Sequence, residues 1–449
     1  MKVCKFGGSS LADAACISNA CDIMLADEDR HIMVVSAPGK RGAEDIKITD
    51  SLIACGERML AGDDGHEGLE PVINRFAEIQ QALGLPDDIR DEIADLLRQR
   101  LDAGQGDVDR YMDGLKASGE DCNARLIAAE FKRRGQAGSY VNPKDAGLLM
   151  REEDGQGRVM DESYANLAVL AEAPGIIVFP GFFGYTPEGA IITFSRGGSD
   201  ITGAILAAAV KADLYENFTD VDSVFAADPR IVSDAAPIPE VTYREMRELA
   251  YAGFNVLHDE AIIPAVRSGI PIQIRNTHRL DAQGTTIVPE HKGTFPRVVG
   301  IASASGFCAI YLRKYLMNKE VGFGRRLLQI LEEECISYEH LPSGIDDMSI
   351  ILKESVLTPE KEVRVVERIR SELEADDVEI ERGLALLMVV GEGMRYNVGL
   401  AAKATRALAD NDVNIEMMNQ GSSEISMMFG LKQEERERGV EALHSAFFE

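Results

Sequence analysis

The first fourteen residues place the strongest constraint on what this chain can fold into. A short apolar segment containing Val3, Cys4 and Phe6 runs directly into Gly7-Gly8-Ser9-Ser10, and Leu11-Ala12-Asp13-Ala14 then opens a helical pattern. That order is typical of a strand, a tight turn and a helix. Glycine permits positive φ and a close approach of two backbones at such a turn. The segment therefore predicts a buried strand that feeds a helix through a glycine turn.

This glycine turn is a candidate anion site. Backbone N–H groups at a helix N-terminus carry partial positive charge, and glycine leaves no side chain in the way of a ligand. Lys5, just before the turn, would add a full positive charge. The other interpretation is an ordinary strand–helix turn with Lys5 on the surface. The Gly-x-x-x-x-Gly-Lys-Ser/Thr pattern of a P-loop is absent from the sequence, so these residues alone leave both interpretations open.

Length and charge limit the classes of protein that this chain can belong to. A chain of 449 residues is expected to form roughly two to four domains. No segment approaches the ~20 apolar residues that span a membrane, and the N-terminus lacks the apolar region of a signal peptide. We therefore expect no membrane association and a cytoplasmic location. The net charge of −28 repels polyanions, so we expect no nucleic-acid partner.

The cysteines and histidines do not form a recognisable metal or disulfide pattern. The seven cysteines are an odd number and include no Cys-x-x-Cys pair, which favours reduced core residues. The seven histidines show no close ligand spacing. We therefore expect no metal site built from protein ligands alone.

The pattern of strands predicts a mainly parallel α/β sheet. Residues 31–35 are apolar on both faces, as in a parallel strand covered by helices. Ser36 follows that strand at its carboxyl end, where open α/β sheets bind ligands. A later strand ends at Ser195-Arg196-Gly197-Gly198-Ser199-Asp200 before an alanine-rich helix, which makes a second strand–glycine–helix turn. Two strand–glycine–helix turns in one domain strengthen the interpretation of a phosphate site.

A long, charged helical region occupies residues 48–130. Within it, Ser118-Gly119-Glu120-Asp121 precedes a second strongly helical run. The sequence therefore predicts that a new helix starts near residue 118. Glu120 is then either an acid at a helix N-terminus or a carboxylate directed at a cationic ligand group.

The pattern changes beyond about Pro296 into two similar, shorter modules. The first is predicted to have strands near 306–312, 337–341, 348–352 and 378–381, with helices at 324–334 and 360–373. The second has strands near 385–390, 413–419 and 424–431, with helices at 399–410 and 434–447. Repetition at this length is typical of βαββαβ ferredoxin-like units. We therefore expect domains at residues 1–295, 296–380 and 381–449.

Several motifs together identify a family. They are Lys5-Phe6-Gly7-Gly8-Ser9-Ser10, Gly197-Gly198-Ser199-Asp200 after Arg196, Thr219-Asp220-Val221, Asp228-Pro229-Arg230, Val256-Leu257-His258 and Gln420-Gly421-Ser422-Ser423-Glu424-Ile425. In this order, over nearly the whole chain, they resemble aspartate kinase, a member of the amino-acid kinase superfamily with C-terminal ACT domains. The resemblance implies an α/β amino-acid-kinase-type sandwich with a mainly parallel central sheet, plus two ferredoxin-like ACT modules.

The resemblance also implies the reaction of ATP with L-aspartate to give 4-phospho-L-aspartate and ADP, with Mg²⁺ as cofactor. Lys5 would stabilise the transferring phosphoryl group, and Asp200 would organise the groups around the phosphates; the alternative for Asp200 is a helix cap. The implied nucleotide-binding residues are Lys5, Phe6, Gly7, Gly8, Ser9, Thr219, Asp220, Phe225, Arg230 and His278. The implied substrate-binding residues are Ser36, Thr49, Glu120, Arg196, Gly197, Gly198 and Ser199, with Glu120 toward the ammonium of aspartate and Arg196 toward its carboxylate.

The chain departs from the family pattern at three positions, two of them in the implied nucleotide site. Phe225 stands where many relatives carry tyrosine, so an apolar wall remains and a hydroxyl contact is lost. Asn255 replaces a lysine three residues before His258, which we interpret as a structural residue. His278 also replaces a lysine, and an unperturbed histidine is mostly neutral near pH 7. A charge contact to ATP from residue 278 is therefore not expected.

The ACT modules imply feedback inhibition by lysine, threonine or both. The expected effector contacts are Met317, Lys319, Val321, Ser343, Gly344, Ile345, Asp346 and Asp347. Asp346 or Asp347 would pair with the amino group of an effector, unless both are ordinary loop acids. The same modules imply a homodimer or a dimer of dimers, and the few residues after the second module imply no fused homoserine dehydrogenase.

Two other functions are compatible with parts of the sequence. One is a non-catalytic amino-acid sensor that keeps the ACT pair, and the other is a sister kinase that acts on another acid. Lys5, Arg196, Asp200 and Glu120 are all present, which argues against a protein that has lost its chemistry. Glu120 and the ACT modules together disfavour a different substrate.

Overall fold

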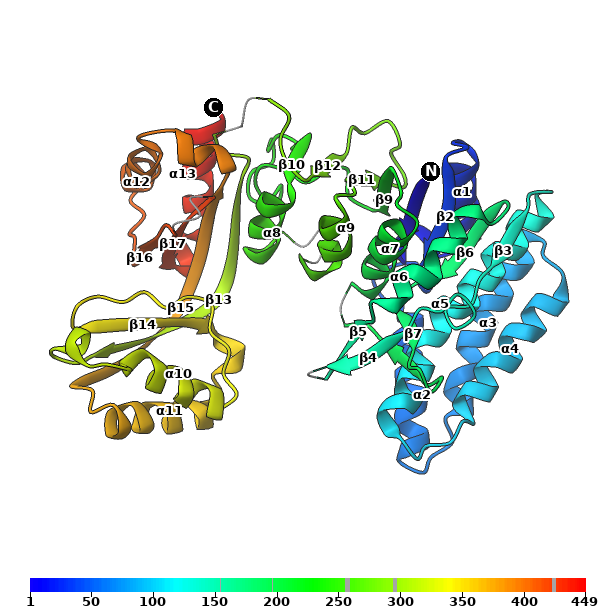
Figure 1. Cartoon of the computed structure of the whole chain (residues 1–449), viewed down its shortest axis with the longest axis horizontal. Helices are drawn as coiled ribbons and strands as arrows, with labels where there is room; N and C mark the ends of the chain where they lie inside the picture. Colours follow the sequence, from blue (N-terminus) through cyan, green and yellow to red (C-terminus); the bar gives the residue numbers. More distant parts are fainter. Residues whose placement is uncertain (154, 196, 255–258, 294–296, 422–424) are drawn as a thin grey trace. The chain divides into compact units, whose positions relative to one another are not determined.

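The computed structural model describes residues 1–153, 155–195, 197–254, 259–293, 297–421 and 425–449 of the chain. It divides into two compact units (Figure 1). The first unit contains Met1–Val224, Pro237–Met246 and Asn255–Lys292, and the second contains Phe225–Ala236, Arg247–Phe254 and Gly293–Glu449. In the part of the chain that is described, no helix combines the length and apolar sequence needed to cross a membrane.

The first unit is built on an eight-stranded sheet. Its order is β10 (Glu240–Thr242), β12 (Thr285–Val288), β11 (Ile272–Asn276), β9 (Leu214–Thr219), β1 (Lys2–Phe6), β2 (Arg30–Val35), β6 (Ile176–Pro180) and β3 (Gly138–Tyr140). Every neighbouring pair is parallel except β11 and β12. The prediction of a mainly parallel α/β sheet is therefore confirmed.

Helices cover both faces of this sheet (Figure 1). The apolar side of β1, with Cys4 and Phe6, shares one core with α1 (Ala14–Leu25), α2 (Ile48–Leu60), α3 (His66–Leu83), α4 (Asp87–Leu101) and α5 (Val108–Arg133). On the other face, α7 (Gly198–Ala209) contacts β1, β2 and β9, and it is flanked by α6 (Glu162–Leu167) and α9 (Ile263–Ser268). Because side chains alternate along a strand, Lys5 points away from that core and toward α7.

Two short hairpins complete the first unit. They are β4 (Met150–Glu153) with β5 (Gln156–Val159), and β7 (Phe183–Tyr185) with β8 (Ile191–Thr193). Strand β8 leads into α7, so the order of strand, glycine turn and helix predicted around residues 195–200 is confirmed.

Helix α5 runs without interruption from Val108 to Arg133, so the predicted helix start near residue 118 is wrong. Ser118 Oγ donates to the carbonyl of Gly114 inside the helix, at 2.9 Å. A Cβ on Gly119 would lie 2.7 Å from the Cβ of Ala37. The Ser-Gly pair therefore allows close packing against the segment after β2, where the sequence pattern had indicated a helix cap.

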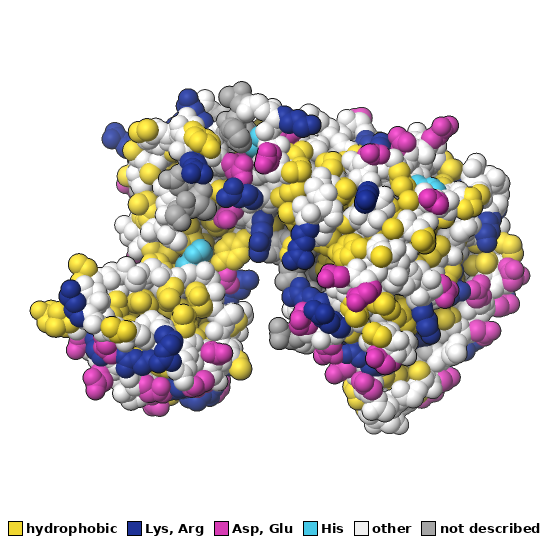
Figure 2. All heavy atoms as spheres, in the orientation of Figure 1, with side chains coloured by type: hydrophobic (Ala, Val, Ile, Leu, Met, Phe, Trp, Pro, Cys, Tyr) yellow, Lys and Arg dark blue, Asp and Glu magenta, His cyan; other side chains and the backbone are white. Residues whose placement is uncertain are grey.

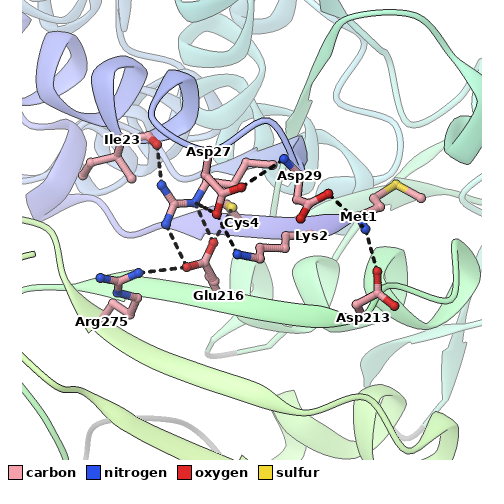
Figure 3. Close-up of polar contacts among 10 residues, drawn as sticks. Met1, Lys2, Cys4, Ile23, Asp27, Asp29, Asp213, Glu216 and Arg275 are labelled. Atoms are coloured by element: carbon pink, nitrogen blue, oxygen red, sulfur yellow. Dashed lines mark hydrogen bonds and ion pairs between the residues drawn. The ribbon is translucent and has the colours of Figure 1, made fainter.

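A buried ionic cluster ties four strands of the first unit together (Figure 3). Glu216 on β9 pairs with Arg30 on β2 through Oε2–Nε (2.7 Å) and Oε1–Nη2 (2.9 Å), and Arg275 on β11 reaches Oε1 at 3.2 Å. Cys4 Sγ on β1 donates to the same carboxylate at 3.4 Å. Burial alone raises the pKa of Glu216, but the hydrogen bonds and charge of Arg30 outweigh it and hold the pKa below its ordinary value. Glu216 is therefore a charged residue whose partners Arg30 and Cys4 are also buried, with Arg275 half-buried beside them.

The second unit contains one antiparallel sheet of five strands. Its order is β14 (Asp347–Lys353), β13 (Gly300–Arg313), β15 (Asp377–Val390), β17 (Ser426–Lys432) and β16 (Met417–Asn419). The helices are α10 (Phe323–Glu333), α11 (Pro359–Glu372), α12 (Leu400–Asp410) and α13 (Arg436–Phe448). They match the predicted helices to within two residues.

Strands β13 and β15 are each shared by two halves of this sheet. Residues 307–313 of β13 pair with β14 and with the first part of β15, whereas residues 300–305 pair with residues 385–390, which also pair with β17. Two separate hydrophobic cores correspond to these halves. The strands predicted at 378–381 and 385–390 are thus one strand, and the predicted boundary at residue 380 falls inside it.

The expected strand at residues 337–341 is not formed. His340 makes a single β-bridge to Ile351 of β14. Helix α8 (Tyr243–Tyr251) begins in the first unit and ends in the second.

Candidate active site

The glycine turn after β1 differs in detail from the sequence prediction. A short 3₁₀ turn covers Ser9–Leu11, and α1 begins only at Ala14, where Asp13 caps the helix by accepting from the N–H of Cys16 at 2.9 Å. Gly7 and Gly8 are not among the described residues with positive φ; Gly8 has φ −60°. The turn therefore does not use the positive φ that glycine permits.

Close approach favours glycine at position 8, whereas a side chain at position 7 would make only an ordinary contact. A Cβ on Gly8 would lie 3.1 Å from the carbonyl oxygen of Ala37, and one on Gly7 would lie 3.5 Å from Lys5 Nζ. The N–H of Gly7 donates to the carbonyl of Phe218 at 3.1 Å, so this amide is used within the sheet. Of the two predicted backbone donors, Gly7 and Gly8, only Gly8 stays a candidate for the phosphates, with Ser9 next to it.

Lys5 meets Asp200 and Asn217 in what we call the Lys5 cluster. Lys5 Nζ lies 2.6 Å from Asp200 Oδ1 and 3.5 Å from Asn217 Oδ1. Asn217 Nδ2 donates to the same Asp200 oxygen at 2.8 Å. Lys5 and Asn217 are paired residues on the neighbouring parallel strands β1 and β9, and both are buried. The interpretation of Lys5 as a solvated surface lysine is therefore wrong.

The second glycine turn presents Asp200 to Lys5. Gly197 is the N-cap of α7 with φ 74°, a left-handed conformation that favours glycine, and no side chain caps this helix. Asp200 lies in the first turn of α7 and pairs with Lys5. The alternative interpretation of Asp200 as a helix cap is therefore wrong, because Gly197 is the N-cap. Gly198 and Ser199 are buried beside it, and Arg196 lies outside the described residues.

The carboxyl ends of the central parallel strands bring further predicted residues to one edge of the sheet. Ser36 follows β2, Thr219 ends β9, and Asp220 comes directly after it. Thr49 lies in the first turn of α2. Ligands of open α/β sheets bind at this edge, next to the Lys5 cluster.

Glu120 is a buried carboxylate with an unused oxygen. Its residue is 6% exposed, and Oε2 has no hydrogen-bond partner. Burial raises the pKa of Glu120 to about 8, against a smaller lowering by the backbone N–H of Ala37. It lies in the middle of α5, so the interpretation as an acid at a helix N-terminus is wrong. An unpartnered buried carboxylate beside the segment after β2 can accept a cationic group of a ligand.

The strand ends of β9 and β11 are joined by hydrogen bonds next to the first turn. The N–H and hydroxyl of Thr277 both donate to the carbonyl of Thr219, at 2.9 and 3.1 Å. Thr277 Oγ1 also lies 2.6 Å from Ser10 Oγ. His278 is exposed, and its backbone N–H donates to Asn276 Oδ1 at 2.7 Å.

Two predicted nucleotide residues belong to the second unit. Phe225 packs at the edge of the core that contains β17 and α12. Arg230 is 86% exposed and forms a forked ion pair with Asp228, whose Oδ2 lies 2.7 Å from Arg230 Nη2.

Three site residues were missed from the sequence: Asn217, Thr277 and Asn123. Asn123 Nδ2 on α5 donates to the carbonyl of Ser36 at 2.7 Å and thereby orients the segment after β2. A polar residue inside the apolar strand 214–218 was the available signal for Asn217. The sequence alone did not link Asn217 to Lys5, because only the register of β1 against β9 places the two side chains together.

The predicted effector residues lie in two segments that touch. The N–H of Asn318 donates to the carbonyl of Ile345 at 3.1 Å, and Asp346 Oδ1 accepts from the N–H of Leu316 at 2.8 Å. Met317 is buried, whereas Lys319, Val321, Ser343, Gly344 and Ile345 are exposed and Asp346 and Asp347 are half-buried. One oxygen of Asp346 is therefore used to hold its own loop.

A cavity of about 510 Å³ lies elsewhere in the first unit, between hairpin β4–β5 and helix α9. Arg151, Arg158 and Arg267 line it together with Glu153 and Asp161. Figure 2 shows basic and acidic side chains interspersed over this hairpin. Ser195 also lines the cavity, but the Lys5 cluster and Glu120 do not, so this cavity is not the candidate site.

Comparisons with known proteins agree with this geometry. Residues 1–276 match the amino acid kinase family, and residues 387–447 match the ACT domain. Aspartokinase 3 of Bacillus subtilis is 55% identical over 448 residues, which cover 100% of this chain and 99% of that protein.

Solved structures with the same fold extend over the whole chain. The crystal structure of Clostridium acetobutylicum aspartate kinase matches with a TM-score of 0.87 at 35% identity, over 99% of each chain. Escherichia coli aspartokinase III, solved with aspartate and ADP and also with lysine and aspartate, matches with a TM-score of 0.80 at 27% identity, over 100% of each chain. The chain therefore belongs to the amino acid kinase family and, within it, to the aspartokinases with ACT domains.

Proposed function

We propose that the protein transfers the γ-phosphoryl group of ATP to the side-chain carboxylate of L-aspartate, giving 4-phospho-L-aspartate and ADP. The observation that carries this proposal is the Lys5 cluster, a buried ammonium held 2.6 Å from Asp200 at the glycine turn. Phosphoryl transfer needs positioned positive charge more than covalent chemistry, because negative charge spreads over the equatorial oxygens in the transition state. A fixed lysine at a phosphate-type turn supplies that charge.

Asp200 orients Lys5 and restrains its motion, and Asn217 holds Asp200 in turn. The second oxygen of Asp200 suits Mg²⁺, which is commonly held by one or two carboxylates together with substrate phosphates. Bound with the nucleotide, Mg²⁺ would neutralise phosphate charge. Gly7 and Gly8 let the phosphates approach Lys5 closely, and Ser9 lies at the start of the 3₁₀ turn.

The substrate is held by opposite charges. Glu120 receives the ammonium of aspartate on its free oxygen, and Arg196 takes the α-carboxylate in a forked contact. Ser36, Thr49, Gly197, Gly198 and Ser199 complete the surroundings of the acid. Thr219, Asp220, Phe225, Arg230 and His278 are the proposed contacts of the nucleotide, and the side chain of His278 is exposed to solvent.

Trapping the acyl phosphate tests this function directly. Purified protein with ATP, Mg²⁺ and L-aspartate is expected to give a hydroxamate when hydroxylamine is present, because hydroxylamine attacks acyl phosphates. Reactions without aspartate, and reactions with L-glutamate in its place, serve as controls. Turnover of glutamate without turnover of aspartate would assign the protein to a sister kinase.

Aspartate binding is expected to release a proton below about pH 8. Burial raises the pKa of Glu120 to about 8, so in the empty site the carboxyl is largely protonated at neutral pH, whereas an adjacent ammonium favours the charged form. Affinity should therefore rise with pH from 6 toward 8, by up to about tenfold per unit. Isothermal titration calorimetry in buffers of different ionisation enthalpy measures the number of protons released when aspartate binds.

The variant Glu120→Gln keeps the size of the side chain and removes the titration. It is expected to raise KM for aspartate by about 10–100-fold, the cost of leaving a buried charged partner unpaired. Binding to this variant should release no proton. Equal proton release from wild type and variant would show that Glu120 is not the group that receives the ammonium.

The second unit is the proposed site of feedback inhibition by lysine, threonine or both. The proposed contacts are Met317, Lys319, Val321, Ser343, Gly344, Ile345, Asp346 and Asp347. Their two segments lie against each other, which supports a shared site. Tyr315, Leu316, Val321 and Ile345 are large apolar residues left exposed there. Such a patch favours a partner, and we propose that a second copy of the chain covers it in a dimer or a dimer of dimers.

A further inference from the structure

Helix α8 is shared by the two units of the chain. Its residues up to Met246 belong to the first unit, and Arg247 onward belongs to the second. Met246 and Leu249 are fully buried. A continuous helix with both ends held by polar contacts can pass a displacement from one end to the other.

The start of α8 is fixed within the first unit. The N–H of Thr242 donates to Glu245 Oε2 at 2.9 Å, and the N–H of Glu245 donates back to Thr242 Oγ1 at 3.2 Å, which is a capping box. His291 lies between two carboxylates, 2.8 Å from Glu245 Oε2 and 3.0 Å from Glu240 Oε1. The first turn of α8 is thus tied to β10 and to the segment after β12.

The end of α8 is held by polar contacts within the second unit. The hydroxyl of Tyr251, the last residue of the helix, donates to Glu339 Oε2 and lies 3.5 Å from His340 Nε2. The rings of Tyr251 and His340 also pack edge to face, with centroids 6.0 Å apart. One turn earlier, Glu248 Oε2 accepts from Ser426 Oγ of β17 at 2.8 Å.

The segment that receives Tyr251 is the one that leads into the proposed effector contacts. Glu339 and His340 are tied to Ile351 of β14, through the N–H of Glu339 to the carbonyl of Ile351 (2.7 Å) and the N–H of Ile351 to the carbonyl of His340 (2.9 Å). Three residues after His340, Ser343 forms a β-bridge to Met348. Both ends of this short segment are paired to β14. A movement of residues 343–347 is therefore expected to be passed on to residues 339–340.

We propose that Tyr251 is the positioning residue that couples the effector site to the kinase site, by joining helix α8 to the segment at residues 339–340. This inference rests on the proposed function. An effector can shift a conformational equilibrium only through contacts that differ between the two states. In this proposal the hydrogen bond from the Tyr251 hydroxyl to Glu339 is the contact that differs between the states, because it joins the effector segment to a helix whose first turn belongs to the unit with the Lys5 cluster.

The variant Tyr251→Phe tests the proposal, because it removes one hydroxyl and keeps the ring against His340. Tyr251 lies outside the proposed binding residues, so activity without effector should equal that of wild type. The concentration of L-lysine that halves activity, alone or with an equal concentration of L-threonine, should rise at least about fivefold, within the usual range of allosteric coupling.

Effector binding gives a second readout that a general loss of stability would not produce. The dissociation constant of the same amino acid is measured by titration with and without saturating ADP and L-aspartate. Coupling is reciprocal, so the ratio of the two constants should move toward one in Tyr251→Phe. Tyr338→Phe is the matched control: Tyr338 precedes Glu339, is 44% exposed against 41% for Tyr251, and should retain the wild-type ratio.

Three results would overturn the inference. One is a wild-type inhibition curve and coupling ratio in Tyr251→Phe, and another is an equal loss of inhibition in Tyr338→Phe. The third is a kinase that neither amino acid inhibits, which would also contradict the proposed regulation but not the reaction. Failure to form the acyl phosphate would instead contradict the proposed reaction itself.

Discussion

Replacing Lys5 with methionine is expected to lower kcat by about 10²–10³-fold, the usual cost of removing one preorganised charge from a transition state. Methionine keeps most of the side-chain length and removes the ammonium 2.6 Å from Asp200. Asp200 keeps its hydrogen bond from Asn217, so the second glycine turn should stay in place. KM for aspartate should change little, since Lys5 acts on charge that develops during transfer. The measurement is steady-state hydroxamate formation, with circular dichroism to verify the fold.

Lys2→Met is the matched control for this prediction. Lys2 lies on the same strand and forms an ion pair of the same length, 2.6 Å, with Asp27 (Figure 3). It lies at the opposite end of β1 from the glycine turn, and kcat should be unchanged. A near-normal kcat in Lys5→Met, or an equal loss in both variants, would refute the role of Lys5 in phosphoryl transfer.

Replacing Glu216 with glutamine is expected to destabilise the first unit by about 3–5 kcal/mol, the cost of leaving a buried charge without its partner. Glutamine retains the shape of the side chain, but Arg30, which is 8% exposed, would lose its only close buried carboxylate among the described residues. The cluster joins β1, β2, β9 and β11, and β1 and β9 also position the Lys5 cluster. The midpoint of urea unfolding, followed by circular dichroism, should fall markedly.

Asp213→Asn is a suitable control because Asp213 lies just before the same strand and pairs with the amino group of Met1 at the surface (Figure 3). Exposed ion pairs contribute little to stability, so its unfolding midpoint should match that of wild type. The double variant Arg30→Met with Glu216→Gln should recover part of the loss, since the buried charge of Arg30 is then removed together with its partner. An unchanged midpoint in Glu216→Gln would mean that water or a shifted side chain compensates Arg30.

Much of the site was predictable because its signals are local. The turns at Gly7-Gly8 and Gly197-Gly198 each need small residues within a few positions of a strand end, so a pattern in the sequence indicates them. Lys5 and Asp200 are adjacent to those turns. Helix starts were less predictable. Ser118-Gly119 has the composition of a helix cap, but the pair lies inside α5, where Gly119 allows close packing against Ala37.

The sequence by itself determined the parallel α/β class, the two glycine turns, the paired ACT modules and the family, since these depend on residue order and local pattern. Only the tertiary structure decided that Asn217 joins Lys5 to Asp200 and that Glu120 is buried with a free oxygen. It alone placed Tyr251 against Glu339 and made β15 one strand across two modules. The reason is physical: these features arise from strand register and from packing between segments up to 212 residues apart, and no local pattern encodes either.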